Sequence, residues 1–477
     1  MTSQRLISTL LLFSVLSVVN ASASEAPPAT PAASSRPRLL VLTDIGGDPD
    51  DQQAMVRLML YSCEFEIEGL VASASGTPGE LKKEIVQPQL IREIVEAYGQ
   101  VLPNLRQHDP RYPAAEDLLA KIKSGNPKRG WAQVGEGRDT EGSRWIVRVI
   151  DRDDPRPLAV SIWGGQTDLA QALWRIRAER GEDGYRKAAA RLRVYDIGDQ
   201  DKIFPHLWKA FPGLFYVLGQ AESGKDKRES VYRGMYLGGD IALTSRAWID
   251  THVRTGHGPL GALYPPKTWT APSPHSALKE GDVPSWFYFL PSGLQDAAHP
   301  EWGGWGGRFQ KAADGVWRDA RDTVGNVTDA RATVWRWRPA FQNAFQARMD
   351  WCVKGPKEAN HAPVAALRAG AAALDGDAAG RIVRIEAAAG AAVRLSAAGS
   401  SDPDGNALTY RWWVYREAGT CAGDVPLSGA DTADAALTVP ADAVGRTIHV
   451  ILEVTDSGDP PLTAYRRAVI AVAQERR

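Results

Sequence analysis

The sequence is poor in cysteine and has no cluster of like charge. Cys63, Cys352 and Cys421 are the only cysteines in 477 residues, and no two have the short spacing of a thiolate zinc site or a dense disulfide framework. The sequence leaves open one disulfide between cysteines that are far apart in the chain. Cys63, inside an apolar helical stretch, is instead predicted to be a buried free thiol. Lys and Arg total 56 against 57 Asp and Glu, with no basic stripe. We therefore expect no nucleic acid polymer as a partner.

Four motifs of common enzyme classes are also missing. The chain has no Gly-x-x-x-x-Gly-Lys-Ser/Thr, no His-Glu-x-x-His, no Gly-x-Gly-x-x-Gly after its first predicted strand and no Gly-x-Ser-x-Gly. Their absence disfavours nucleoside triphosphate, zinc peptidase, NAD and serine esterase chemistry.

Only one long apolar run occurs, at residues 6–19. It follows Arg5 and precedes a small-residue stretch that resembles a signal-peptidase site after Ala23. We therefore predict a signal peptide over residues 1–23, a periplasmic or extracellular location, and no membrane contact after its removal. An uncleaved anchor is the alternative, although the run is shorter than the roughly 20 residues of a spanning helix. Residues 24–36, rich in Pro, Ala and Ser, are predicted to form a linker.

A chain of this length is too long for a single hydrophobic core, so more than one domain is expected. From residue 37 to 355, the alternation of apolar runs with helical periodicity predicts an α/β domain. Apolar runs typical of strands buried on both faces occur at residues 39–43, 67–72, 158–163, 192–197 and 214–218. Helical periodicity lies between them, at residues 52–61 and 169–180. This alternation predicts a doubly wound, mostly parallel sheet. Residues 255–310, rich in Gly, Pro and Trp, are expected to form long loops that can carry a site.

The composition changes again after Ala359, and residues 360–477 are predicted to form a small all-β immunoglobulin-like sandwich. Alternating runs at residues 408–415, 436–439 and 448–454 predict its strands. The turn SSDPDGN at residues 400–406 resembles turns of bacterial immunoglobulin-like and polycystic-kidney-disease-type modules. We expect no chemistry from this part.

Four aspartates, Asp44, Asp48, Asp50 and Asp51, crowd the junction between the first predicted strand and the first predicted helix. Ligands of open α/β sheets bind at that edge. Carboxylates this close repel one another unless a cation neutralises them, and a set of oxygen ligands favours calcium over zinc or copper. The alternative is that the aspartates only cap the helix and form a turn.

Four segments of the chain resemble a known family. TDIGGDPDD, at residues 43–51, is similar to the aspartate signature with which calcium-dependent nucleoside hydrolases open. VSIWGGQTDLA, at residues 160–170, resembles their mid-chain strand, and EGDVPS, at residues 280–285, resembles the segment that supplies their last aspartate ligand. PEWGGWGGR, at residues 300–308, and the C-terminal sandwich resemble a bacterial subgroup named for cellulose binding, whose catalytic-type domain is nucleoside-hydrolase-like.

The resemblance implies roles for five residues. Asp44, Asp51 and Asp282 would bind calcium through their side chains, and Trp163 would bind it through its backbone carbonyl. Asp50 would hydrogen-bond the hydroxyls of a furanose. Asp44 would also be the general base that takes a proton from a calcium-bound water, so that the water attacks the anomeric carbon. The surrounding carboxylates would stabilise the positive charge of an oxocarbenium-like transition state.

Two departures from the family pattern leave roles open. The loop between Asp44 and the Asp50-Asp51 pair is two residues longer than in typical nucleoside hydrolases, so Asp48 is a candidate for substrate binding or could exchange ligand roles with Asp44. Gly281 stands where many members have the histidine that protonates the leaving base. Histidines of the predicted loops could substitute for it, although an isolated loop histidine is more often a surface residue: they are His257, His275 and His299.

Three further side chains are candidates for substrate contact. Trp302 and Trp305, spaced by glycines, could stack on a sugar ring or could instead fix a loop to the core. Asp199 follows the strand that ends at Ile197 and should reach the same sheet edge, although a solvated turn is the stronger alternative.

The sequence thus predicts an exported, calcium-dependent hydrolase of N-glycosidic bonds that acts on a small-molecule glycoside or a polysaccharide. The alternative is a non-catalytic carbohydrate-binding protein, for example for cellulose, that uses the same cleft. The absent histidine and the added sandwich favour the alternative, and the metal-binding loop favours the hydrolase.

Overall fold

The computed structural model describes Met1 and residues 36–76, 83–268, 277–370, 373–376 and 381–473. The predicted signal peptide and nearly all of the predicted linker lie outside these residues. No helix among the described residues has both the length and the apolar character needed to cross a membrane.

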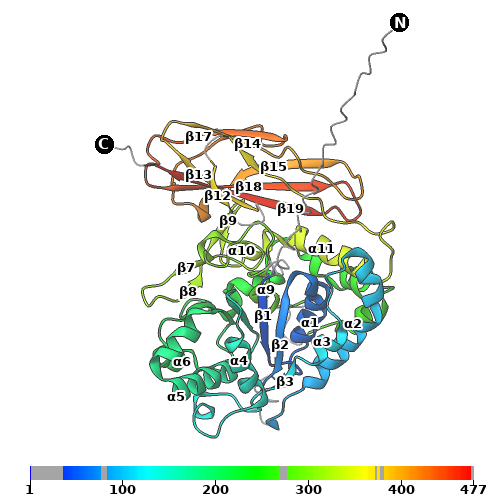
Figure 1. Ribbon diagram of the computed structural model, residues 1–477, viewed down its shortest axis with the longest axis vertical. Coiled ribbons are helices and arrows are strands. Elements are labelled where there is room, and N and C mark those ends of the chain that lie inside the picture. The colour runs from blue at the N-terminus through cyan, green and yellow to red at the C-terminus, as the bar shows by residue number, and fades with distance from the viewer. Residues whose placement is uncertain (2–35, 77–82, 269–276, 371–372, 377–380, 474–477) are drawn as a thin grey trace. The chain divides into compact units, whose positions relative to one another are not determined.

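The largest sheet has eight strands in the order β3-β2-β1-β4-β5-β6-β8-β7 (Figure 1). Its strands are β1 (Arg38–Thr43), β2 (Glu66–Ala72), β3 (Ile122–Ser124), β4 (Leu158–Ile162), β5 (Leu192–Ile197), β6 (Phe215–Gly219), β7 (Phe309–Lys311) and β8 (Trp317–Asp319). All neighbours from β3 to β8 pair in parallel, and β7 is antiparallel to β8. The predicted doubly wound, mostly parallel sheet is confirmed.

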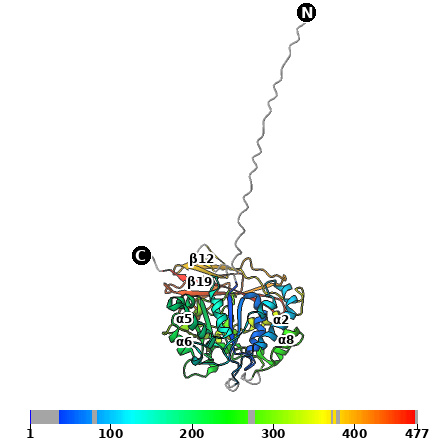
Figure 2. The same ribbon diagram turned by 60° about the horizontal axis from the view of Figure 1, so that its bottom comes forward.

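Helices cover both faces of this sheet. Side chains alternate along β1, so Leu39 and Val41 pack in one hydrophobic core and Leu40 and Leu42 in another. Figure 2 shows α5 and α6 on the opposite side of the strands from α2 and α8. The helices up to β6 are α1 (Asp50–Leu60), α2 (Pro88–His108), α3 (Ala115–Leu119), α4 (Glu141–Asp151), α5 (Gln166–Ala190) and α6 (Phe204–Ala210). Because each strand is buried on both faces, it reads as a continuous apolar run.

The segment after β6 is mainly irregular and contains short helices. They are α7 (Arg246–Ile249), α8 (Gly258–Ala262), α9 (Val283–Phe287), α10 (Ala332–Trp335) and the longer α11 (Arg338–Asp350). A hairpin of β9 (Asp322–Val324) and β10 (Val327–Asp329) precedes α10. This segment brings α9, and Asp282 before it, against the end of the sheet, because α9 contacts both β4 and β5.

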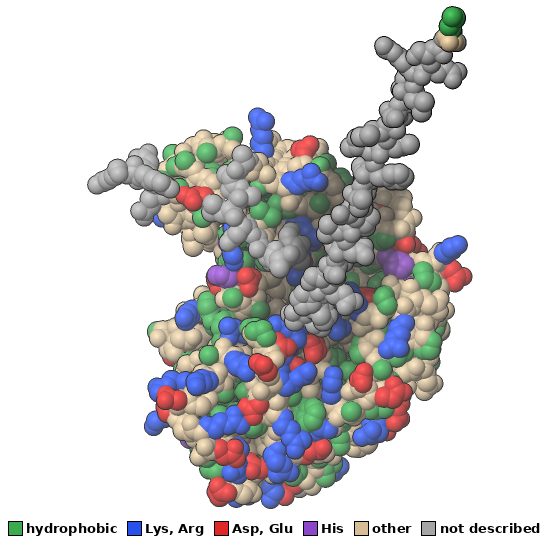
Figure 3. Space-filling view, viewed as in Figure 1, with side chains coloured by type: hydrophobic (Ala, Val, Ile, Leu, Met, Phe, Trp, Pro, Cys, Tyr) green, Lys and Arg blue, Asp and Glu red, His purple; other side chains and the backbone are tan. Residues whose placement is uncertain are grey.

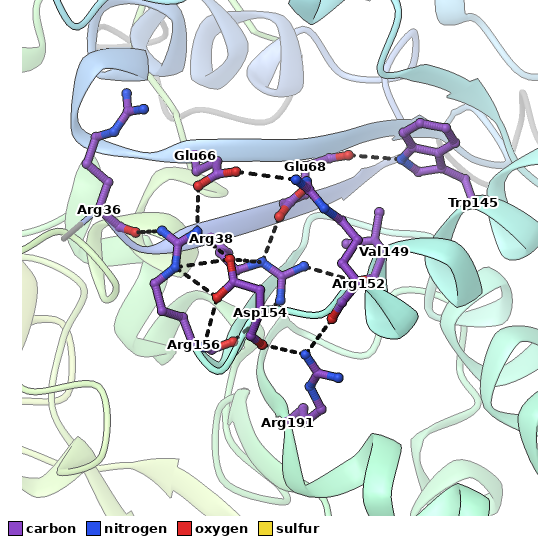
Figure 4. A network of polar contacts seen from close by, with 10 residues as sticks. All are labelled: Arg36, Arg38, Glu66, Glu68, Trp145, Val149, Arg152, Asp154, Arg156 and Arg191. Atoms are coloured by element: carbon purple, nitrogen blue, oxygen red, sulfur yellow. Dashed lines mark hydrogen bonds and ion pairs between the residues drawn. The ribbon is translucent and has the colours of Figure 1, made fainter. Parts of the chain in front are cut away.

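An ion-pair network closes the end of the sheet where β1 and β2 begin. Figure 4 shows its charged side chains, which are Arg38, Glu66, Glu68, Arg152, Asp154 and Arg156. Arg38 Nε lies 2.6 Å from Glu68 Oε1, and both side chains are buried. Because the network surrounds the amino ends of the strands, it stabilises the sheet at the edge opposite to the acidic segment.

The C-terminal part consists of two packed sheets, as predicted. One contains β11 (Arg368–Ala369), β14 (Ala392–Ser396), β17 (Asp434–Thr438) and β16 (Leu427–Ser428). The other contains β12 (Ala373–Gly376), β13 (Ile382–Ala387), β19 (Thr463–Val472), β18 (Thr447–Asp456) and β15 (Leu408–Val414). Leu395 and Leu437 from the first sheet and Leu452 from the second share a core.

The sandwich shares polar and apolar contacts with the α/β part. The buried Arg467 guanidinium, on β19, donates to the carbonyls of Leu294, Trp302 and Gly303 at 2.5, 3.0 and 3.0 Å. Tyr465, also on β19, belongs to the same hydrophobic core as side chains of α1 and α9. Residues 37–355 and 360–477 share one hydrophobic core. Their division into two domains therefore stays a proposal from the sequence.

His449 makes this contact sensitive to acid. Its Nδ1 accepts a hydrogen bond of 2.8 Å from Arg467, which has only donors to offer. Burial and the Arg467 charge lower the pKa of His449 to about 2. Below the ordinary imidazole pKa of about 6.5, the unfolded chain therefore takes up a proton at His449 that the folded protein does not.

We expect the free energy of unfolding to fall below pH 6.5, with His449 contributing up to about 1.4 kcal/mol per pH unit. The His449→Gln variant keeps a hydrogen-bond acceptor. When the unfolding free energy is measured by urea titration between pH 6 and 4, its dependence on pH should be weaker in this variant, by the equivalent of about one proton. His206→Gln, at an exposed position, serves as the control. Equal slopes for the His449 variant and the unchanged protein would contradict this expectation.

Candidate metal and carbohydrate site

The acidic segment lies where the strand order of the sheet reverses. β1 and β4 are neighbours at this switch point, and they end at Thr43 and Ile162. Open α/β sheets bind ligands in the crevice outside the carboxyl ends of such strands. Asp44 follows β1 directly, and Asp50 and Asp51 open α1. The structure therefore places these three carboxylates at the predicted edge.

Close backbone packing holds the turn between β1 and α1. Gly46 has a backbone φ of 102°, which residues other than glycine rarely adopt. A Cβ atom on Gly47 would lie 2.6 Å from the Cα of Gly76. The Ser75 hydroxyl also donates to the carbonyl of Ile45 at 2.7 Å. The turn is thus fixed against the segment that follows β2.

Asp50, Asp51 and Asp282 form a buried cluster. One oxygen from each lies within 4.8 Å of the others. The Thr43 hydroxyl donates to Asp51. Oδ2 of Asp282 is buried and has no hydrogen-bond partner among the described residues. The structure therefore brings Asp51 and Asp282 together, as the sequence predicted, and adds Asp50 to them.

The electrostatics of this cluster fit a hard divalent cation. Burial, followed by repulsion from Asp44 and Asp282, raises the pKa of Asp51 well above its usual range. Burial, followed by repulsion from Asp50 and Asp44, does the same for Asp282. Calcium binds oxygen at roughly 2.3–2.6 Å, so ligands on opposite sides of the ion lie about 5 Å apart. The three oxygens of this cluster all lie within 4.8 Å of one another, which is close enough for one ion to contact all of them.

Lys279 neutralises one side of the acidic segment. Its Nζ lies 2.7 Å from Oδ2 of Asp48 and 2.7 Å from Oδ2 of Asp50. These two carboxylates raise the pKa of Lys279 although burial opposes them, so the ammonium stays charged. Asp48 is therefore an ion-pair partner of Lys279. Whether Asp48 could replace Asp44 as a metal ligand was left open by the sequence, and no contact of the described residues supports it.

Arg129 pairs with Asp44, the predicted ligand and general base. The same guanidinium donates to the carbonyls of Ala74 and Gly76 at 3.0 and 3.1 Å. Burial raises the pKa of Asp44 to about 6, and the Arg129 charge opposes this rise. The sequence predicted that a cation must neutralise the four aspartates, and side chains of the protein supply part of that charge. Arg129 pairs with Asp44, and the single ammonium of Lys279 pairs with both Asp48 and Asp50, whereas no cation of the described segments pairs with Asp51.

The Trp163 carbonyl, predicted as a further ligand, has a partner within the protein. It accepts a hydrogen bond from the Gln200 side-chain amide. The Trp163 indole is fully buried and donates to the hydroxyls of Ser161 and Ser285 at 2.8 and 3.0 Å. One lone pair of the carbonyl is thus engaged by Gln200, and the second remains for a further partner.

Asp199 caps a helix and does not line the cleft, so its proposed substrate contact is corrected. Its Oδ1 accepts hydrogen bonds from the backbone N–H groups of Ile203 and Phe204 at 2.9 and 3.0 Å, at the start of α6. The next residue, Gln200, does line the cleft. The Asp199 carboxylate points toward the start of α6 because the first backbone N–H groups of a helix need acceptors.

The prediction that Trp302 and Trp305 stack on a sugar is also corrected. Both rings are buried, with exposed fractions of 6% and 5%, and neither lines the cleft. Trp302 stacks on His299 with ring centroids 4.1 Å apart. Trp305 packs against Phe287 and against Tyr465 of the sandwich. The two rings therefore anchor the loop, which was the alternative interpretation.

No histidine among the described residues lines the cleft. His257 is buried and pairs with Asp350, and His299 pairs with Glu301. His275 lies outside the described residues. Gly281, which replaces the usual histidine, does line the cleft.

The cleft has a volume of about 1340 Å³, which exceeds the roughly 300–1,000 Å³ of most ligand pockets. Many of its lining residues were not predicted from the sequence, and five of them lie close to the acidic segment: Arg129, Tyr232, Arg233, Tyr236 and Lys279. Lys279 directly precedes the EGDVPS segment and could have been noticed there. The other four lie in irregular segments or short 3₁₀ turns without a motif, so only the fold brings them to the site.

Comparisons with known proteins agree with this architecture. The family model "Cellulose-binding Sde182, nucleoside hydrolase-like domain" matches residues 38–309. The model "Cellulose-binding protein Sde0182, C-terminal domain" matches residues 392–472. No curated protein matches the sequence.

A nucleoside hydrolase-related hypothetical protein from Saccharophagus degradans, described as associated with carbohydrate metabolism, has a similar structure. It is 33% identical with a TM-score of 0.74, and the match covers 92% of this chain and 100% of that chain. The type III effector protein XopQ, solved with adenosine diphosphate ribose, is 13% identical with a TM-score of 0.33, over 68% of this chain and 96% of that chain. The second likeness is too low to support any conclusion about function.

Proposed function

Because the chain belongs to the family of cellulose-binding, nucleoside hydrolase-like proteins described for Sde182, we propose that it hydrolyses an N-glycosidic bond in the cleft. Calcium is the proposed cofactor. The supporting observation is the buried cluster of Asp50, Asp51 and Asp282, in which one oxygen of Asp282 lacks any partner among the described residues. A carboxylate cluster so destabilised in the protein alone is typical of a functional site.

Asp50, Asp51 and Asp282 would hold the ion, since calcium prefers oxygen ligands. Asp50, expected from the sequence to bind the sugar, would thus take the ligand role expected of Asp44, which pairs with Arg129. A bound divalent cation supplies a nucleophile at neutral pH. Asp44 would accept the proton of the attacking water, because burial raises its pKa above the usual carboxyl range and so makes it a stronger base. Arg129 would orient Asp44, and the carboxylates of the floor would stabilise positive charge at the anomeric carbon.

The leaving group is the weak point of this mechanism. Since no histidine of the described segments lines the cleft, the usual proton donor to a leaving base is missing there. We therefore expect the protein to cleave aryl ribosides, whose phenolate leaves without a proton, faster than ordinary nucleosides.

The test compares release of ribose from 4-nitrophenyl riboside and from nucleosides, with calcium, in the unchanged protein and in Asp44→Asn and Asp51→Asn. We expect turnover that falls at least about 100-fold in both variants, because each removes a group that acts in the transition state. Glu222→Gln removes a carboxylate from the same cleft but outside the cluster, and should keep the activity. Turnover that survives in Asp51→Asn would refute the proposed mechanism.

A non-catalytic carbohydrate-binding role is the second candidate. The ion pair that engages Asp44 and the absent histidine both favour it. No tryptophan or tyrosine of the described segments is fully exposed, and the cleft has the volume to hold a sugar chain, so we place the binding there. Retention on cellulose that soluble cello-oligosaccharides abolish, without turnover of any glycoside, would support this role over hydrolysis.

We also propose that the protein is exported. The apolar run at residues 6–19 and the small residues before Glu25 support this. A polymer such as cellulose cannot enter a cell, so a protein that binds it has to act outside the cytoplasm.

A further inference from the structure

Charge is distributed unevenly along the cleft. Its floor carries five carboxylates, from Asp44, Asp48, Asp50, Asp51 and Asp282. Its outer part, formed by the segments after β5 and β6 and by the hairpin of β7 and β8, is rich in cations. These outer cations, here called the basic rim, are Lys202, Lys225, Lys227, Arg228, Lys311 and Arg318.

Few carboxylates balance the basic rim. Glu222 and Asp319 are the acids that line this outer part, and Asp319 is buried and accepts hydrogen bonds from Ser230 and the backbone of Val231. Arg228 and Arg318 have acidic partners outside the cleft lining, Asp226 at 3.6 Å and Asp314 at 2.8 Å. The lysines of the rim have no acidic partner within 4 Å in the part of the chain that the structure describes.

Lys202, Lys225 and Lys227 are exposed and form no ion pair with any described residue. On the face shown in Figure 3, by contrast, Lys and Arg side chains are interspersed with Asp and Glu. Cations of one sign at the mouth of a cleft concentrate the field there and attract an anion. Lys202 acts electrostatically on Asp199, whereas the charges of Lys225 and Lys227 have no acidic partner among the described residues.

Neutral ligands leave these charges without a partner as well, since neither cellulose nor an ordinary nucleoside carries an anionic group. We propose that the ligand of this cleft is a glycoside that bears a phosphate or carboxylate group, and that Lys202, Lys225 and Lys227 bind this group. The inference rests on the proposed function, because it takes the acidic floor as the sugar site. The volume of about 1340 Å³ leaves room for a charged substituent beyond one sugar ring.

The two ends of the cleft also orient such a ligand. Its anionic group is attracted by the basic rim, whereas three carboxylates of the floor are already paired with Arg129 and Lys279, so binding with the anionic group at the rim is favoured. This arrangement directs the uncharged anomeric end toward Asp51 and Asp282.

Calorimetry with two matched pairs of probes tests the inference, with calcium present and at low salt. The pairs are ribose with ribose 5-phosphate, and glucose with glucuronate; the first reports on phosphate and the second on carboxylate. We expect at least one anionic probe to bind about tenfold more tightly than its neutral partner, and this advantage should largely disappear at about 0.5 M salt. Equal affinities within both pairs would overturn the inference.

A charge variant locates the effect. Lys225→Gln/Lys227→Gln should lose most of the anionic advantage, whereas Lys187→Gln/Lys357→Gln, at exposed positions outside the cleft, changes the net charge equally and should keep it. An advantage that survives in the rim variant but disappears in Asp51→Asn would mean that the anion binds the metal, and would overturn the inference. In that case, or if only neutral sugars bind, the proposed function stands. If the protein takes up neither calcium nor any sugar, both fail.

Discussion

Replacing Asp282 by Asn is expected to abolish calcium binding and, without calcium, to raise the stability of the protein. Asp282 is buried beside two other carboxylates, and one of its oxygens has no partner among the described residues. Removing its charge relieves repulsion within the cluster, which should stabilise the metal-free protein by about 1–2 kcal/mol. The same change removes one of three carboxylate ligands, so the affinity for calcium should fall at least about 100-fold.

Thermal unfolding with and without calcium distinguishes these effects. The unchanged protein should gain about 2.7 kcal/mol at a calcium concentration 100 times its Kd, because the ion binds only the folded state. Asp282→Asn should start from a higher Tm and gain almost nothing. Glu222→Gln, in the same cleft but outside the cluster, should behave like the unchanged protein. If Asp282→Asn still responds fully to calcium, the ion binds elsewhere.

The strands and the acidic cluster were predictable because both follow from local sequence patterns. A strand buried on both faces is a continuous apolar run, and β1 to β6 agree with five such predicted runs apart from the short β3. Asp51 and Asp282 belong to segments that resemble those of a known family. The fold then brings these segments together, since Asp51 opens α1 and Asp282 directly precedes α9.

The polar partners of the site were not predictable in the same way. Lys279 and Arg129 neutralise aspartates that lie far from them in the sequence, and no spacing rule connects such residues. Asp199 follows β5 as expected, but local helix capping determines where its side chain points. Trp302 and Trp305 are flanked by glycines, which suggested open rings. They are buried because segments distant in sequence, including the sandwich, cover them.

Asp322 is the buried acid on which the contact between the α/β part and the sandwich most depends. Its side chain is completely buried. Oδ1 accepts a hydrogen bond of 2.7 Å from Arg308, and Oδ2 accepts bonds from Arg336 at 2.8 Å and from the Tyr415 hydroxyl at 2.6 Å. The Arg336 guanidinium also lies over the rings of Trp413 and Tyr415. One carboxylate thus neutralises two guanidinium groups and fixes a tyrosine of the sandwich.

The Asp322→Ala variant is therefore expected to lose about 3–5 kcal/mol of unfolding free energy, because it removes the acidic partner of Arg308 and leaves Arg336 with only Glu417, at 3.9 Å. Urea titration followed by tryptophan fluorescence measures this loss, and Trp337 and Trp413, whose rings lie 5.7 Å apart across the contact, report on its opening. Asp151→Ala breaks an exposed ion pair with Arg180 and should cost at most about 1 kcal/mol. Equal losses in the two variants would show that Asp322 contributes no more than a surface charge, and that apolar packing alone holds the sandwich against the α/β part.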